Sequence, residues 1–111
     1  MELLLVMTQV PNQECAQRIA QCLLKNHFAA CVNILAPCHS FYHWQGALES
    51  NEEIPLIIKT TQQRYAQVET TIREYHPYEL PEIVALQITQ GLPAYLRWVL
   101  DSTQRGETRY V

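Results

Sequence analysis

The sequence has little of what nucleotide-binding, nucleic-acid-binding and membrane proteins use. Its three glycines, Gly46, Gly91 and Gly106, lie far apart, so the chain has no glycine-rich phosphate loop. Eleven acidic residues against eight basic ones give a net charge of −3, which disfavours nucleic acid as a partner. No apolar run approaches the ~18 residues that a membrane helix needs. With 48% apolar and 17% charged residues, the composition is that of an ordinary globular protein.

The length of 111 residues predicts one domain, residues 1–111. The apolar stretch at residues 1–6 is too short for a signal peptide and has no basic flank. We therefore expect a cytoplasmic protein whose four cysteines are free thiols rather than a disulfide framework. The chain also lacks a Ser-His-Asp order and an HExxH motif, so we predict no enzymatic activity.

Hydrophobic periodicity predicts alternating strands and helices. Strands are predicted at residues 3–7, 29–44, 53–61 and 83–88. Amphipathic helices are predicted at residues 14–28, 62–75 and 92–100. The order β-α-β-β-α-β plus a terminal helix is that of a ferredoxin-like α+β fold, with both central helices on one face of an antiparallel sheet. Pro55 cannot donate to a strand ladder, which indicates a bulge or an edge position.

The second and third strands should form an unusually long hairpin that turns at Gly46. An unbroken strand from Ala30 to Gly46 would span roughly 55 Å, whereas a compact domain of this length is only about 35 Å across. The hairpin should therefore overhang its own core even if Pro37 interrupts it. A naked aromatic overhang usually meets a partner, so we predict oligomerisation. Three aromatic residues should form this interface: Phe41, Tyr42 and Trp44.

Residues 76–83 form the segment with the most chemistry, because a histidine, a tyrosine and two glutamates lie among two stiffening prolines. His76 could bind a metal ion or accept a proton near neutral pH. Glu79 and Glu82 could add oxygen ligands or orient the imidazole ring. His76 could equally cap the second helix while the glutamates bind backbone or a neighbouring subunit. The residues alone leave both interpretations open.

The thiols and the other histidines give weaker signals of metal binding. Cys15 and Cys22 lie about 10 Å apart along a helix, so one ion could not bridge them, and we interpret them as buried apolar groups. Cys31 could supply a thiolate ligand or simply pack within the sheet. Three further residues show no geometric cluster and are interpreted as solvated or interface residues: Cys38, His39 and His43.

Five motifs follow one another along the chain: Ala29-Ala30-Cys31-Val32-Asn33-Ile34, Ser40-x-Tyr42-x-Trp44-x-Gly46, Lys59-Thr60, His76-Pro77-Tyr78-Glu79-x-Pro81-Glu82-Ile83 and Gly91-x-x-x-Tyr95-Leu96-x-Trp98. Together they resemble the CutA family, the divalent-cation tolerance proteins, over essentially the whole chain. The resemblance implies a ferredoxin-like homotrimer in which long hairpin arms pack on adjacent subunits. It also implies a link to the tolerance of copper and other divalent ions.

The motifs and the resemblance predict a trimeric, non-enzymatic protein of the response to divalent metal ions, with no obligatory cofactor. Weak binding of copper or another divalent cation is expected at clefts between subunits, through His76, Glu79, Glu82 and Cys31 of a neighbour. Four further residues should line this cleft: Lys59, Tyr78, Tyr95 and Trp98. One alternative is a PII-like signalling scaffold that binds a small anion or a partner protein. Another is a purely structural assembly with empty clefts.

Overall fold

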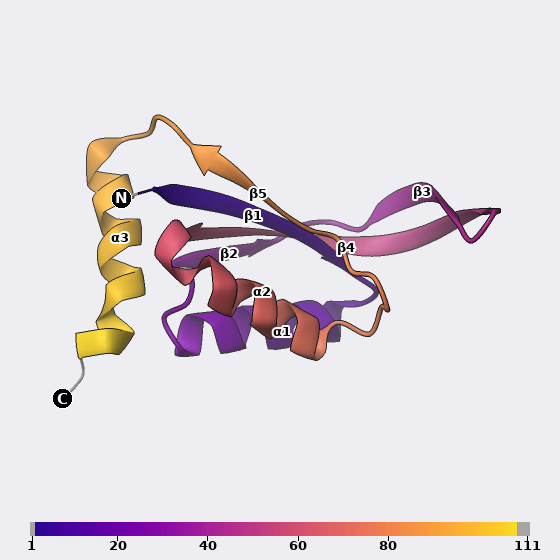
Figure 1. The fold of residues 1–111 in the computed structure, drawn as a ribbon, viewed down its shortest axis with the longest axis horizontal. Coiled ribbons are helices and arrows are strands. Elements are labelled where there is room, and N and C mark those ends of the chain that lie inside the picture. Colours follow the sequence, from indigo (N-terminus) through magenta and orange to yellow (C-terminus); the bar gives the residue numbers. More distant parts are fainter. Residues whose placement is uncertain (1, 109–111) are drawn as a thin grey trace.

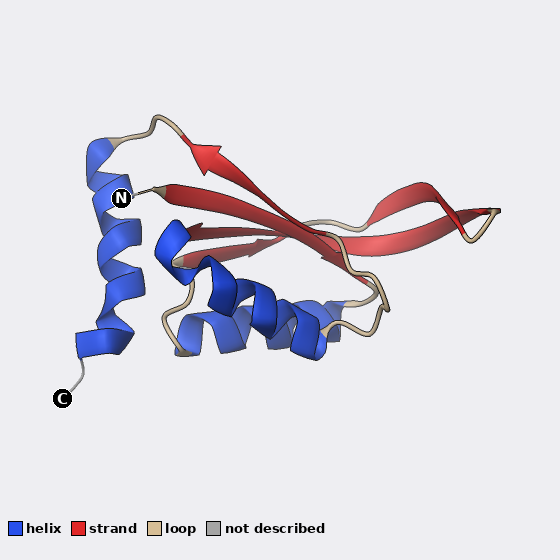
Figure 2. Cartoon of the chain, in the orientation of Figure 1, coloured by secondary structure: helices blue, strands red, loops and turns tan. Residues whose placement is uncertain are grey.

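The computed structural model describes residues 2–108, which form a five-stranded antiparallel sheet and three α-helices (Figure 1). The strands are β1 (Leu3–Val10), β2 (Cys31–Ile34), β3 (Cys38–Trp44), β4 (Ala47–Thr61) and β5 (Ile83–Ile88). The helices are α1 (Gln13–Lys25), α2 (Tyr65–Tyr75) and α3 (Pro93–Thr108), with a short 3-10 helix at Gln62–Arg64. Figure 2 shows α1 and α2 together on one face of the sheet. The predicted α+β class and antiparallel sheet are confirmed.

The sheet has the strand order β2-β4-β1-β5, and β3 continues from β2 along the outer part of β4. Counted as one interrupted strand, β2 and β3 complete the β-α-β-β-α-β order expected from the sequence. β2 ends opposite Leu56 and β3 begins opposite Glu53, so four steps along the interrupted strand face three along β4. This extra residue is the bulge that Pro55 predicted. The alternative edge position is wrong, because β4 lies between β2 and β1.

Helix α1 begins and ends where local capping groups allow. The Asn12 side chain accepts the Cys15 amide at 2.8 Å, so Asn12 is the N-cap. The predicted end at residue 28 is three residues too late. His27 has a positive φ of 58°, and the Asn26 side-chain amide donates to the Cys22 carbonyl at 2.9 Å. Both features end a helix rather than extend it.

Helix α3 runs to Thr108, beyond the predicted end at residue 100. Thr103 is buried, and its carbonyl accepts a hydrogen bond from the Arg64 guanidinium Nε at 2.9 Å. Part of the predicted polar tail at residues 103–111 is thus a docked helix, and residues 109–111 lie outside the described part of the chain. Within that part, no helix has both the length and the apolar content to cross a membrane.

The hairpin of β3 with residues 47–53 of β4 extends beyond the rest of the molecule and is called the arm (Figure 1). Its two-residue turn has positive φ at both positions, 53° for Gln45 and 83° for Gly46, as a type I′ turn requires. The molecule measures 49 × 30 × 23 Å along its principal axes. The predicted turn and overhang are therefore confirmed.

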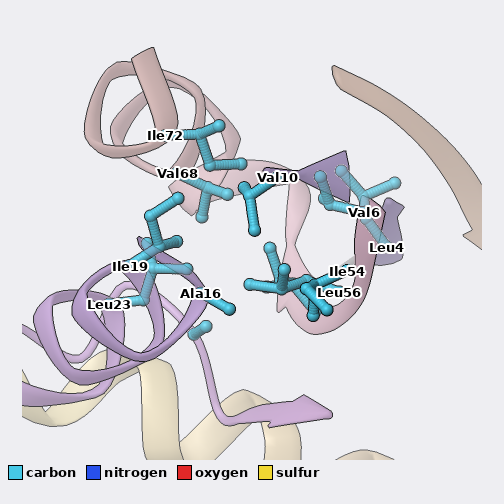
Figure 3. Close-up of a cluster of buried hydrophobic side chains, with 12 residues drawn as sticks. Leu4, Val6, Val10, Ala16, Ile19, Leu23, Ile54, Leu56, Val68 and Ile72 are labelled. Carbon is cyan, nitrogen blue, oxygen red and sulfur yellow. The ribbon is translucent and has the colours of Figure 1, made fainter. Parts of the chain in front are cut away.

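The core fills the space between the sheet and the two helices that cover it. Figure 3 shows Ile19 of α1 and Ile72 of α2 pointing toward Val10 of β1, and all three are fully buried. β1 alternates between buried and half-buried side chains, as a strand with one covered face should. In α2 the predicted inward residues Val68, Thr71 and Ile72 are buried and Tyr65 is half-buried. The prediction is wrong for Tyr75, which is 39% exposed.

The opposite face of the sheet stays partly uncovered. In the register, Val84 and Leu86 of β5 lie opposite Met7 and Leu5, on the face away from α1 and α2. Val84 is 46% exposed and Leu86 is 58% exposed. We call this surface the open face. Apolar side chains at these positions are unusual on a sheet face in contact with water.

Candidate functional site

His76 holds together the segment at residues 76–83, which we call the corner. Its amide caps α2 by donating to the Ile72 carbonyl at 2.9 Å, and its backbone is extended, as the proline after it predicted. The Tyr78 amide donates to Nδ1 at 3.3 Å. The neutral ring therefore carries its proton on Nε2, which donates to the Gln9 carbonyl at 2.6 Å. His76 would have to release one of these bonds to bind a metal ion.

Gln9 of β1 connects the corner to the base of the arm. In Figure 1 the loop from α2 to β5 passes near this base. Its carbonyl binds His76, and its side-chain Oε1 accepts the Ser40 hydroxyl at 3.0 Å. The Cys38 thiol lies 3.7 Å from the same oxygen. Sequence reasoning missed Gln9, because a single polar residue near a strand end resembles any solvent-facing position. Its role becomes visible only in its contact with Ser40, which is 31 positions away in the sequence.

A cleft of about 680 Å³ lies between the arm and the corner. Tyr78, Glu79 and Glu82 line the corner side of this cleft. From β3 the arm contributes Ser40 and the four residues that follow it, Phe41, Tyr42, His43 and Trp44. The structure therefore brings together two sets of residues that were predicted separately, the glutamates of the corner and the aromatic residues of the arm. We call this the corner cleft.

The corner cleft is acidic. Glu53, Glu79 and Glu82 line it, and its lining contains no lysine or arginine among the described residues. Glu53 is only 7% exposed, and it is hydrogen-bonded to the Tyr78 hydroxyl. Burial, followed by this hydrogen bond, raises the pKa of Tyr78 to about 12, so the hydroxyl stays protonated and donates at neutral pH. A cleft of this charge attracts cations.

The four remaining predicted residues meet elsewhere, beside α3. The Lys59 ammonium donates to the Asn33 side-chain oxygen at 2.6 Å, and the Cys31 thiol lies 3.8 Å from the same oxygen. Tyr95 of α3 is hydrogen-bonded to Cys31, and its pKa is raised by burial and by this thiol. The Trp98 ring lies 5.5 Å from that of Tyr95. Figure 1 places α3 at the opposite end of the molecule from the arm.

The predicted cleft is therefore split in one chain, since Tyr78 lies apart from Lys59, Tyr95 and Trp98. Cys31 pairs with Lys59, and Gln9 at the corner pairs with Pro55. The two positions on β4 are four residue steps apart, which is about 13 Å at strand spacing. No three His, Cys, Asp or Glu side chains in the described residues are grouped closely enough to hold a metal ion. A site that joins Cys31 to the corner requires a second subunit.

The other thiols and histidines occupy ordinary positions. All four cysteines are free and half-buried, so Cys15 and Cys22 are less buried than predicted, although Cys15 packs against the core. The Cys15 thiol donates to the Tyr75 carbonyl at 3.4 Å, and burial raises its pKa. His39 is exposed on the arm, whereas His43 lines the corner cleft. The sequence did not indicate that His43 shares a cleft with the predicted ligands Glu79 and Glu82.

The model of the CutA1 divalent ion tolerance protein family matches residues 4–102. The divalent-cation tolerance protein CutA of Thermus thermophilus is 40% identical over 98 residues, which cover 88% of this chain and 95% of that protein. A CutA homolog of Xenopus laevis is 42% identical over 82% of this chain, and the chain spans only 60% of its length. The crystal structure of CutA from Xylella fastidiosa superimposes with a TM-score of 0.89 at 36% identity, covering 93% of this chain and 99% of that one.

Proposed function

The chain belongs to the CutA1 divalent ion tolerance protein family, and we propose that it acts in the response to divalent metal ions as a non-enzymatic ferredoxin-like homotrimer. It binds copper or another divalent cation weakly and reversibly at clefts between subunits. Glu79 and Glu82 supply oxygen ligands, and the softer ligands that Cu²⁺ and Zn²⁺ prefer come from a second subunit, because no three such side chains are grouped in the described residues of one chain. A neighbour's Cys31 completes the coordination where the subunits meet.

The acidic lining of the corner cleft carries this proposal. Two carboxylates on a stiff loop and a third on β4 concentrate negative charge without any basic residue in the lining. The same lining disfavours a small anionic ligand at this place. His76 is best suited to positioning, because both ring nitrogens already hold the corner and β1 in place. An incomplete ligand set in one chain is what a site shared between subunits requires.

Exposed apolar side chains support the homotrimer. Phe41 and Leu80 are each 70% exposed on either side of the corner cleft. The open face adds Leu86, which is 58% exposed. Surfaces of this kind mark contacts with other proteins. Because the corner cleft and the open face lie on different parts of one chain, copies can use both to close a ring.

Calorimetric titration with Cu²⁺ and Zn²⁺ tests the binding site. We expect Glu79→Gln combined with Glu82→Gln to weaken binding on the order of tenfold or more. Glu52→Gln is the control, because it removes one glutamate charge from an exposed arm position outside the cleft lining. Cys31→Ser, titrated in the assembled protein, measures the contribution of the neighbouring thiol.

Two results would overturn this function. Equal Cu²⁺ affinity in the wild type and the double glutamate variant would remove the corner cleft as the site. Micromolar binding of a nucleotide or organic anion with no response to metal would favour the PII-like scaffold instead. Light scattering tests the assembly separately, since a monomer mass at micromolar concentration would contradict the trimer.

A further inference from the structure

A second cleft, of about 600 Å³, lies on the outer surface of α1 and α2, which pack side by side (Figure 1). Asn26, just after α1, and Tyr75, the last residue of α2, form part of its wall. The other four lining residues share one face of α1, because the last three follow the first at three, four and seven positions. These residues are Arg18, Gln21, Cys22 and Lys25. Both the corner cleft and the open face are elsewhere.

The Cys22 sulfur in this cleft accepts hydrogen bonds. The Asn26 side-chain amide lies 3.5 Å from the sulfur and donates to it. The Tyr75 hydroxyl also bonds to Cys22, and this bond is the largest cause that raises the pKa of Tyr75. Tyr75 therefore keeps its proton at neutral pH and acts as a donor. Negative charge that develops on this sulfur during a reaction is stabilised by both groups.

The other three thiols all act as hydrogen-bond donors, although Cys31 also bonds to the Tyr95 hydroxyl. Each donates to an oxygen atom, and such a bond favours the protonated thiol. The acceptors are the Tyr75 carbonyl, the Asn33 side-chain oxygen and the Gln9 side-chain oxygen. The donors are, in the same order, Cys15, Cys31 and Cys38. Cys22 is set apart by its place in this cleft, which it shares with two cationic side chains.

Arg18 and Lys25 place positive charge on both sides of Cys22, about 6 Å and 4.5 Å away along the helix axis. Arg18 makes an ion pair with Glu14 at 3.7 Å, but both side chains are largely exposed, so this pair is weak. Glu74 is a further acidic neighbour of Tyr75. The lining itself contains two cations and no carboxylate among the described residues, so small anions are attracted.

We propose that Cys22 is a modification site for small disulfides that carry carboxylates. The carboxylates bind Arg18 and Lys25, which brings the disulfide against the Cys22 sulfur. After its proton passes to solvent, the Cys22 thiolate attacks one sulfur of the disulfide. A new S–S bond forms to Cys22, the original S–S bond breaks, and the other half leaves as a thiolate. The disulfide is the oxidant, so no further reactant is needed.

Two aromatic disulfides of opposite character test this site in the intact protein. Dithiobis(nitrobenzoate) carries a carboxylate on each ring, whereas dithiodipyridine is uncharged at neutral pH. We expect the anionic reagent to modify Cys22 first, as peptide mass mapping will identify, and Cys22→Ser to remove the fast phase of thiolate release. Arg18→Gln with Lys25→Gln should slow the anionic reagent on the order of 3- to 10-fold and the neutral one less than about twofold.

Arg73→Gln is the matched control, because it removes an exposed positive charge from α2 without touching the cleft lining. It should leave the rates of both reagents unchanged. The proposal is wrong if another cysteine reacts as fast as Cys22 with the anionic reagent. It is equally wrong if removing Arg18 and Lys25 slows both reagents to the same extent, since that result reports altered folding or access rather than anion binding.

Discussion

The two halves of β4 belong to one continuous strand but differ in which side chains they bury. The inner half, residues 54–61, lies beside β1, and its Leu56 and Ile58 side chains are fully buried against the helices. The outer half, residues 47–53, pairs with β3 alone and leaves Leu48 70% exposed. One strand thus passes from a region that completes its own packing to a region that does not.

This difference shows which part of the molecule leaves apolar surface exposed. An isolated two-stranded ribbon is at best marginally stable in water. On one face of the arm, Phe41 and Leu48 are diagonal neighbours in the register, and both are 70% exposed. Two contacts at the base tie the arm to the core, from Gln9 to Ser40 and from Tyr78 to Glu53. The outer apolar face stays exposed in the single chain.

The largest effect is expected in the inner half of β4. Leu56→Ala should lower the free energy of unfolding by about 2–5 kcal/mol, because it leaves a cavity between the sheet and the helices. Leu48→Ala in the outer half is the matched control and should change the unfolding of the single chain by less than about 0.5 kcal/mol. Urea denaturation at several protein concentrations separates folding from assembly. Equal losses for both variants would break the distinction between the two halves.

Much of the fold could be predicted because the inner regions have strong periodicity. The strand at Ile83–Ile88 was predicted residue for residue, since two glutamates and a proline precede its short apolar run. Boundaries that depend on a single backbone angle were missed, as at His27, where a positive φ ends α1. The outer half of β4 was also missed, because polar residues such as Glu49 and Asn51 pair only with β3 and give no apolar signal.

The candidate site was less predictable than the fold. Sequence spacing identified Glu79 and Glu82, because they lie on one short stiff loop and reach the same cleft. It could not foresee that the His76 ring nitrogens are occupied, since one partner is the carbonyl of Gln9, 67 residues away. Backbone acceptors have no residue signature. Buried Glu53 was missed for the related reason that its partner, Tyr78, is distant in sequence.

An intermediate effect is expected at the junction between the two regions. His76→Ala should cost about 1–3 kcal/mol, because it leaves the Gln9 carbonyl and the Tyr78 amide without their partners. His39→Ala, an exposed histidine on the arm, should change stability by less than about 0.5 kcal/mol. Denaturation curves measure both values. A stability loss confined to the metal-loaded protein would instead identify His76 as a ligand.

The smallest effect on the single chain, and the largest on assembly, is expected at the arm. Phe41→Ser with Leu48→Ser removes two exposed apolar side chains, so the folding of the isolated chain should change by less than about 0.5 kcal/mol. Light scattering should show a fall from the mass of three chains to that of one at micromolar concentration. His39→Ser, at an exposed polar position of the same ribbon, should leave the mass unchanged. An intact assembly in the double variant would mean that the outer half of β4 is covered by something other than a neighbouring subunit.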